Sequence, residues 1–252
     1  MLRITEAVKH ILIINVLFFL ATQLYAEQMY QWFSLWFPKN ENFGLWQIVT
    51  HMFMHGGIAH IGFNMFALWM FGGPVEQALG KNRFLFVYFS AGLGAVLFQL
   101  AFYYFSFLPA QEALLNVGLT EDMVMDVVNS RQFTEGLSDV QKNMLNSQTT
   151  ATYLDAYLAR MVGASGCIMG ILAAFGMMNP EAKLMLIFLP IPIKAKYFIP
   201  GIILLDVISA ITGQSFFSPS NTAYMAHVGG AVVGFLIMWY WKKNQFNKNR
   251  WD

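Results

Sequence analysis

The sequence contains little charge and a single cysteine. Only 12% of its 252 residues are charged and 57% are hydrophobic, whereas an average soluble domain has about 25% charged residues. This composition indicates a polytopic membrane protein. The one cysteine, Cys167, excludes a disulfide framework and a cysteine-rich metal site within the chain, and it is expected to be a small buried apolar residue. The formal net charge of +1 gives no indication of a nucleic-acid partner.

The sequence also shows no internal repeat. Many transporters are built from matching repeats with broken helices, so this absence argues against a small-solute channel or transporter. A single membrane domain covering residues 1–252 is the expected organisation.

Apolar runs predict six membrane-spanning helices and therefore an all-α polytopic bundle. A hydrocarbon layer of about 30 Å needs roughly 20 residues of helix, with shorter helices ending inside it. The first run resembles a signal peptide, but the bulky Leu24, two residues before Ala26, favours an uncleaved span. The expected spans are residues 11–26, 58–79, 84–107, 165–178, 197–211 and 224–241.

Three segments outside these spans have distinct compositions. Residues 27–55 are dense in aromatic side chains, which favour the membrane–water interface, so we expect this first loop to lie half in the outer leaflet. Residues 108–162 form a long polar insertion between the third and fourth helices, with apolar positions that suggest short amphipathic helices. Residues 184–193 are apolar but contain two prolines, and we expect them to be interfacial.

The basic residues predict the orientation of the spans. If both termini are cytoplasmic, most of the fifteen Lys and Arg residues lie on the inner side, as the positive-inside rule requires. The insertion at residues 108–162 is then extracytoplasmic. We therefore expect a multi-pass protein of a bacterial cytoplasmic membrane. The inner residues are Arg3, Lys9, Lys81, Arg83, Lys183, Lys194, Lys196, Lys242, Lys243, Lys248 and Arg250.

A serine and a histidine stand on two spans that carry small residues. Ser165 opens the short fourth helix, ahead of small residues spaced four apart at Gly166, Gly170 and Ala174. The sixth span places His227 on the same stripe as glycines at 230 and 234. Such stripes let two helix backbones approach closely. A serine and a histidine brought together in this way form a nucleophile and its base.

Three polar side chains are predicted to share one depth in the membrane. Ser165 precedes Asn179, the end of its helix, by 14 residues. His227 precedes Lys242 by 15, and Asn64 precedes Lys81 by 17. At about 1.5 Å per residue these positions lie roughly 21, 22 and 25 Å above the inner end of their helices. Unpaired N–H groups at the start of the fourth helix would point into this layer and stabilise an oxyanion by about 3–4 kcal/mol each.

Other titratable residues receive different interpretations. His51, His55 and His60 raise the alternative of a metal site, but the sequence lacks a His-Glu-x-x-His motif and a cysteine cluster, so we expect neither a metal nor another cofactor. Asp206, within the fifth span, is interpreted as a structural hydrogen-bond partner and is not included in the catalytic set. Glu76 lies far below the Ser165 layer and is interpreted as an anchor at the inner end of its helix.

Three motifs together resemble the rhomboid family of intramembrane serine proteases. They occur in the family's order and are spread over most of the chain. Gly163-Ala164-Ser165-Gly166 matches GxSG, His60-Ile61-Gly62-Phe63-Asn64 matches HxxxN, and Ala226-His227 with Gly230 and Gly234 matches AHxxGxxxG.

The resemblance implies a six-helix core and a catalytic mechanism. Ser165 would be the nucleophile and His227 the general base and then the general acid, without a third carboxylate. His60, Asn64 and the backbone N–H of Ser165 would form the oxyanion hole. The substrate would be a single-span transmembrane protein that enters laterally from the lipid bilayer past the fifth helix, and no cofactor is implied.

The sequence departs from the family pattern at three places. Gln47 follows Trp46 where many members have arginine, Met169 stands where many have an aromatic residue, and the insertion at 108–162 is longer than the loop of compact members. An alternative function is that of a catalytically inactive relative that binds and escorts membrane proteins. The presence of both Ser165 and His227 argues against that alternative.

Overall fold

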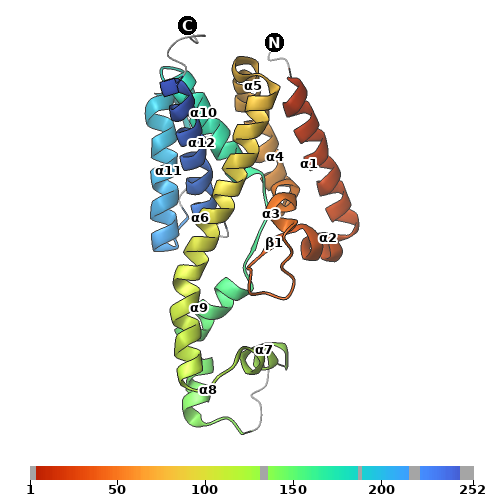
Figure 1. The fold of residues 1–252 in the computed structure, drawn as a ribbon, viewed down its shortest axis with the longest axis vertical. Coiled ribbons are helices and arrows are strands. Elements are labelled where there is room, and N and C mark those ends of the chain that lie inside the picture. The colour runs from red at the N-terminus through yellow and green to blue at the C-terminus, as the bar shows by residue number, and fades with distance from the viewer. Residues whose placement is uncertain (1–3, 131–135, 187–188, 216–221, 245–252) are drawn as a thin grey trace. The chain divides into compact units, whose positions relative to one another are not determined.

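The computed structural model describes residues 4–130, 136–186, 189–215 and 222–244, and most of them are helical (Figure 1). This confirms the predicted all-α polytopic fold. The elements are α1 (Glu6–Leu24), α2 (Ala26–Phe33), β1 (Leu35–Trp36), α3 (Gln47–Thr50), η1 (His51–Phe53), α4 (Ile58–Ala67), η2 (Leu68–Gly72), α5 (Gly73–Leu79), α6 (Lys81–Asn116), α7 (Glu121–Ser130), α8 (Asp139–Leu145), α9 (Gln148–Tyr157), β2 (Arg160–Met161), α10 (Ser165–Met178), β3 (Lys183–Leu186), β4 (Leu189–Lys194), α11 (Ala195–Thr212) and α12 (Tyr224–Asn244).

Five helical segments among the described residues are long and apolar enough to cross a membrane. They are α1, the continuous segment α4–η2–α5, α6, α11 and α12. The apolar α10 has only 14 residues, or about 21 Å of helix. These five helical segments and α10 correspond to the six predicted spans.

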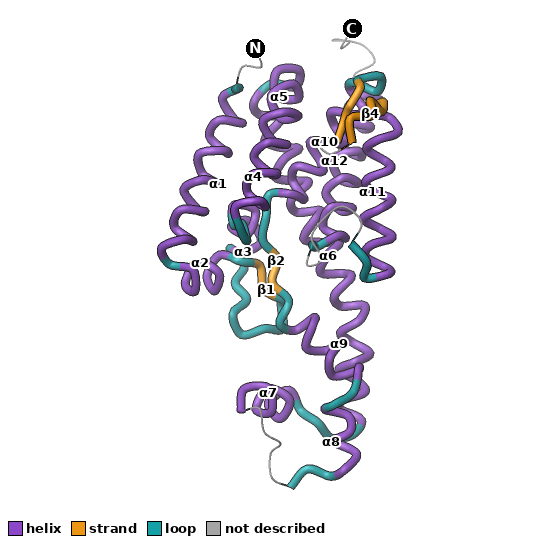
Figure 2. The backbone as a smooth tube through the Cα atoms, turned by 180° about the vertical axis from the view of Figure 1, so that it is seen from behind, coloured by secondary structure: helices purple, strands orange, loops and turns teal. Residues whose placement is uncertain are grey.

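The chain separates into two compact units. The larger unit contains the described residues within 1–35, 44–99 and 161–252, and the smaller contains 36–43 and 100–160. In the larger unit, α10, α11 and α12 run side by side (Figures 1 and 2). The candidate catalytic residues all belong to this larger unit.

The third span was predicted to end at residue 107, but α6 continues to Asn116. Pro109 lies inside this helix, although proline removes one backbone hydrogen bond. Phe107 and Leu114, on either side of the proline, are buried in the core of the smaller unit. Burial of these side chains explains why the helix continues into the segment predicted as a polar insertion.

The smaller unit has a hydrophobic core of its own. Phe107 of α6 stacks on Tyr153 of α9 at a ring-centroid distance of 5.0 Å, and Phe37 lies 4.8 Å from Phe107. Val124 of α7 is buried in the same cluster. The amphipathic helices predicted for residues 108–162 therefore pack on each other and on the end of α6.

The segment 184–193 was predicted to be interfacial, and its described residues belong to two paired strands, β3 and β4. Figure 2 shows the strand pair that includes β4 beside the start of α11. The strands are antiparallel and pair Lys183 with Lys194 and Leu184 with Ile193. The prolines that argue against a membrane helix here are compatible with a short strand pair, where a residue at an edge needs no backbone N–H.

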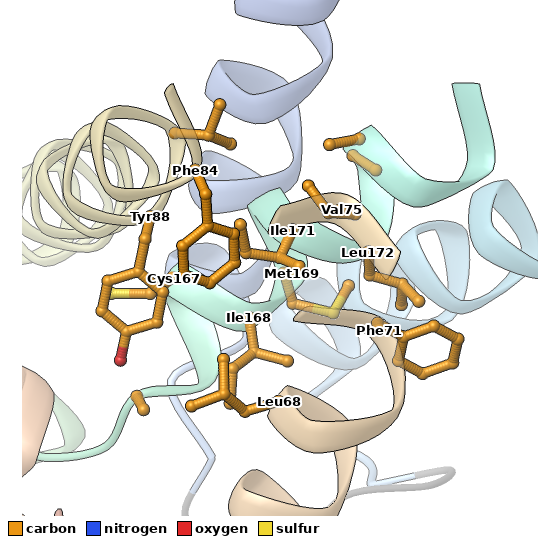
Figure 3. Close-up of a cluster of buried hydrophobic side chains, with 14 of the residues drawn as sticks. Leu68, Phe71, Val75, Phe84, Tyr88, Cys167, Ile168, Met169, Ile171 and Leu172 are labelled. Atoms are coloured by element: carbon orange, nitrogen blue, oxygen red, sulfur yellow. The ribbon is translucent and has the colours of Figure 1, made fainter. Parts of the chain in front are cut away.

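Helix α10 is surrounded by the hydrophobic core of the larger unit (Figure 3). Leu68, Phe71 and Val75 of the α4–η2–α5 segment lie in the same cluster as Ile168 and Ile171 of α10. Cys167, predicted to be a small buried residue, and Met169 also belong to this cluster.

Glu76 of α5 joins the ends of two spans. Its carboxylate accepts hydrogen bonds from the backbone N–H groups of Ala7 and Val8 at 2.9 and 3.0 Å, and from the Thr5 hydroxyl. These N–H groups belong to the first turn of α1, where helix geometry leaves them unpaired and favours negative charge. This geometry agrees with the interpretation of Glu76 as an anchor.

Replacing Glu76 with glutamine should lower the free energy of unfolding by about 1–3 kcal/mol, because an amide oxygen cannot pair both N–H groups and the hydroxyl equally well. Thermal unfolding in detergent measures the effect. The matched control is Glu6→Gln, which removes an ion pair with Lys81 whose side chains are 60% and 47% exposed. Such an exposed ion pair contributes little to stability. Equal losses of unfolding free energy in Glu76→Gln and Glu6→Gln would therefore contradict the role of Glu76 as an anchor.

Candidate active site

The packing of α10 against α12 depends on glycine. A Cβ atom added to Gly230 would lie 2.0 Å from the carbonyl oxygen of Gly166, and one added to Gly234 would lie 2.4 Å from that of Gly170. No side chain fits at either distance, so the two backbones are in direct contact. The predicted close approach of the two small-residue stripes is confirmed.

Helix α6 completes this packing and was not included in the sequence-based prediction. A Cβ atom on Gly166 would lie 2.4 Å from Cβ of Ala95, and one on Gly170 would lie 2.2 Å from Cβ of Ala91. The side chain of Gln99, one helical turn beyond Ala95, accepts a hydrogen bond from the N–H of Ala226 at 3.1 Å. Helix α6 thus holds the start of α12, where His227 follows.

Ser165 and His227 meet at the beginnings of these two helices. The distance between Oγ of Ser165 and Nε2 of His227 is 2.9 Å. Both residues are partly exposed, whereas their neighbours Gly166 and Val228 are buried. A hydroxyl at this distance from an imidazole can give up its proton as it attacks an electrophile.

The other ring nitrogen of His227 faces Asp206 of α11. Nδ1 of His227 lies 3.0 Å from Oδ2 of Asp206, and the side chains are only 12% and 7% exposed. The sequence-based interpretation of Asp206 as a structural hydrogen-bond partner did not identify His227 as the residue that it contacts. A carboxylate in an apolar span was the available signal, but the sequence does not show which way the side chain points.

His60 and Asn64 converge on the backbone just before Ser165. A Cβ atom placed on Gly163 would lie 2.8 Å from Nε2 of His60 and 3.7 Å from Nδ2 of Asn64. Nδ2 of Asn64 is buried and has no hydrogen-bond partner among the described residues. Nδ1 of His60 accepts a hydrogen bond from the N–H of Gly56 at 3.3 Å, so a neutral ring carries its proton on Nε2. Both side chains thus present N–H donors next to Ser165.

The turn that leads into α10 requires a glycine. Gly163 has a φ angle of +124°, which residues with a side chain rarely adopt. Its N–H donates to the carbonyl oxygen of His51 at 2.9 Å, which ties the turn to the first loop. The backbone N–H of Ser165, in the first turn of α10, has no partner within the helix.

Comparison with known proteins agrees with this geometry. Residues 42–120 and 141–244 match the model of the Rhomboid domain. The chain belongs to the rhomboid family. Both helix pairs that carry the site, α4 with α6 and α10 with α12, lie within the matched ranges.

Several rhomboid proteins are similar to this chain. Presenilin-associated rhomboid-like protein A, mitochondrial, from Danio rerio is 27% identical over 204 residues, covering 79% of this chain and 39% of that protein. Rhomboid protease AarA from Providencia stuartii is 27% identical over 201 residues, covering 76% and 54%. Rhomboid protein 1, mitochondrial, from Saccharomyces cerevisiae is 26% identical over 197 residues, covering 78% and 42%. The chain therefore matches between about two fifths and about half of the length of these relatives.

The first loop of this rhomboid is anchored by Gln47, at the position where the family pattern suggested arginine. Gln47 is fully buried, and Nε2 donates to the carbonyl oxygens of Gln31 and Trp32 of α2 at 3.2 and 3.4 Å. Its own carbonyl oxygen lies 2.8 Å from Nδ1 of His51. Because the carbonyl of His51 in turn accepts from Gly163, the loop anchor is connected to the turn before Ser165.

His51 and His55 are buried in this loop, outside the candidate spans. Burial lowers the pKa of each to about 4, and the nearby His60 ring contributes to the shift for His55. The part of the chain that the structure describes contains no group of three or more His, Cys, Asp or Glu residues placed to hold a metal ion.

Replacing Gly230 with alanine should separate α10 from α12, because the new methyl group would overlap the Gly166 carbonyl. We expect a loss of about 1–3 kcal/mol in unfolding free energy, measured by thermal unfolding in detergent. Gly201→Ala in α11 is the matched control, since a Cβ atom there meets nothing within 4 Å. Wild-type stability of the Gly230 variant would contradict the backbone contact.

Stability should fall in acid as the buried histidines gain protons. The unfolded chain takes up these protons near pH 6.5, but the folded chain does so only near pH 4. The stabilisation is therefore complete above pH 6.5 and is lost as the pH falls toward 4, by roughly 3 kcal/mol per ring. Unfolding in detergent between pH 7.5 and pH 4 tests this prediction. His55→Gln should reduce the slope of the unfolding free energy against pH. An unchanged slope in His55→Gln would contradict the contribution of His55 to the loss of stability in acid.

Proposed function

We propose that the chain is an intramembrane serine endopeptidase. The observation that carries this proposal is the 2.9 Å distance between Oγ of Ser165 and Nε2 of His227. Membership of the rhomboid family, in which AarA is named as a protease, supports it. The pair occupies helices that are apolar enough for a membrane, so the reaction would take place within the bilayer.

The proposed reaction begins with attack by Ser165. As Oγ bonds to the carbonyl carbon of the substrate, its proton passes to Nε2 of His227. The carbonyl oxygen becomes an oxyanion, and His227 then gives the proton to the leaving amine as the peptide bond breaks. A water molecule, deprotonated by His227, hydrolyses the acyl-enzyme and releases the second product with Ser165 restored.

The oxyanion would be stabilised by three donors around Gly163. They are the backbone N–H of Ser165 and the side-chain N–H groups of His60 and Asn64. Support comes from the lack of any partner for Nδ2 of Asn64 among the described residues, since a buried donor without a partner is costly unless it serves another purpose. A single donor of this kind contributes about 3–4 kcal/mol to the transition state.

We propose single-span transmembrane proteins as the substrates. A transmembrane segment can diffuse within the bilayer to residues at this depth, and its backbone must unwind locally to present a carbonyl group to Ser165. The distribution of Lys and Arg supports a cytoplasmic position of both termini in a bacterial cytoplasmic membrane. Two relatives are named as mitochondrial proteins, so the host membrane is proposed from the charge distribution alone.

A fluorophosphonate probe should label the wild-type protein in detergent and should fail to label Ser165→Ala, because the probe reacts with an activated serine. Removal of the base in His227→Ala should slow labelling by about 10²–10⁴-fold. Ser209→Ala is the control, since Ser209 is a buried serine of α11 outside the proposed site. In-gel fluorescence measures the rates.

Equal labelling of the wild type and Ser165→Ala would overturn the proposed activity. The same result, together with capture of uncleaved membrane proteins, would instead favour the inactive escort function.

A further inference from the structure

We propose that Asp206 is a positioning residue that converts the Ser165–His227 pair into a triad. This inference rests on the proposed protease function. The three side chains come from α11, α12 and α10, and the imidazole of His227 lies between the carboxylate and the hydroxyl. The contact distances are 3.0 Å on the Nδ1 side and 2.9 Å on the Nε2 side.

The chemistry of the carboxylate determines which ring nitrogen carries the proton. An ionised carboxylate only accepts hydrogen bonds, so a proton of His227 that faces Asp206 must be on Nδ1. Nε2 then has a free lone pair directed at the Ser165 hydroxyl. This is the tautomer that a general base requires. Without Asp206, the neutral ring could carry its proton on Nε2 and could not accept the serine proton.

The same carboxylate stabilises the charge that forms during the reaction. When His227 takes the proton of Ser165, the ring becomes an imidazolium whose Nδ1–H already donates to Asp206. The side chains of His227 and Asp206 are largely withdrawn from solvent, so this interaction is stronger than it would be in water. The stabilisation appears only as charge develops, so it should act on the rate of the chemical step and leave binding unchanged.

The surroundings of Asp206 indicate that its position is tied to His227. It is 5% exposed in a helix that has few buried residues. Across the described part of the chain, His227 is the one side chain that hydrogen-bonds to it. A carboxylate in an apolar span is costly unless it is paired, and here the pairing is with the proposed base.

Two substitutions separate a positioning role from a structural one. Asp206→Asn keeps the shape of the side chain and can still hydrogen-bond to Nδ1. However, its amide group can donate and so favour the wrong tautomer. Asp206→Ala removes the partner altogether. A structural role predicts nearly wild-type activity for the asparagine variant and a larger loss for alanine. The positioning role predicts that asparagine is at least as damaging as alanine.

The experiment measures fluorophosphonate labelling of the full chain in detergent as a function of probe concentration. We expect Asp206→Asn to lower the maximal rate of labelling by about 10²–10⁴-fold, with a change of less than about threefold in the probe concentration for half-maximal rate. The maximal rate of labelling should fall no further in Asp206→Ala than in Asp206→Asn. Ser209→Ala, which alters a buried residue one turn away on the same helix, should label like the wild type.

Thermal unfolding checks that each variant is folded. If Asp206→Ala does not fold, the labelling rate of Asp206→Asn alone decides the test. A wild-type labelling rate in folded Asp206→Asn would overturn this proposal. If labelling still requires Ser165 in that case, the proposed protease function stands without the third residue. If Ser165→Ala labels like the wild type, the protease function itself fails.

Discussion

The direct contact between the backbones of α10 and α12 is the constraint on which the rest of the site depends. Gly230 and Gly234 lie against the carbonyl groups of Gly166 and Gly170, at distances that leave no room for a methyl group. The distance between Ser165 and His227 is therefore set by main-chain contact, which is stiffer than packing through flexible side chains. Helix α6 supports the same contact with Ala91 and Ala95.

A second set of interactions fixes the segments around this contact. Within the first loop, Gln47 of α3 hydrogen-bonds to α2. His51 contacts the Gln47 carbonyl through its ring and accepts from the N–H of Gly163, which connects the loop to that turn. Glu76 of α5 holds the first turn of α1. Each of these residues is polar and buried, and each pairs with backbone groups of a neighbouring segment or turn. Buried polar side chains here hold helices and loops together.

Much of the fold and part of the site could be predicted because the signals are local. Apolar runs located the spans, and glycines spaced four apart predicted the contact that brings Ser165 to His227. The end of α6 could not be predicted, because Pro109 is kept in the helix by burial of Phe107 and Leu114 in a cluster formed by distant residues. Asp206 was recognised as unusual, but its partner depends on the rotation of α11. The strands β3 and β4 depend on their pairing with each other, which hydrophobicity does not reveal.

The positions of the reactive residues relative to the glycines explain how the site can be tightly packed and still open. Each residue advances about 100° around a helix, so Ser165 is offset by about 100° from Gly166, and His227, three residues before Gly230, by about 60°. The hydroxyl and the imidazole thus lie at the rim of the seam between the helices and not on it. The seam itself is dry, as the burial of its glycines shows, while the two rim residues remain partly exposed.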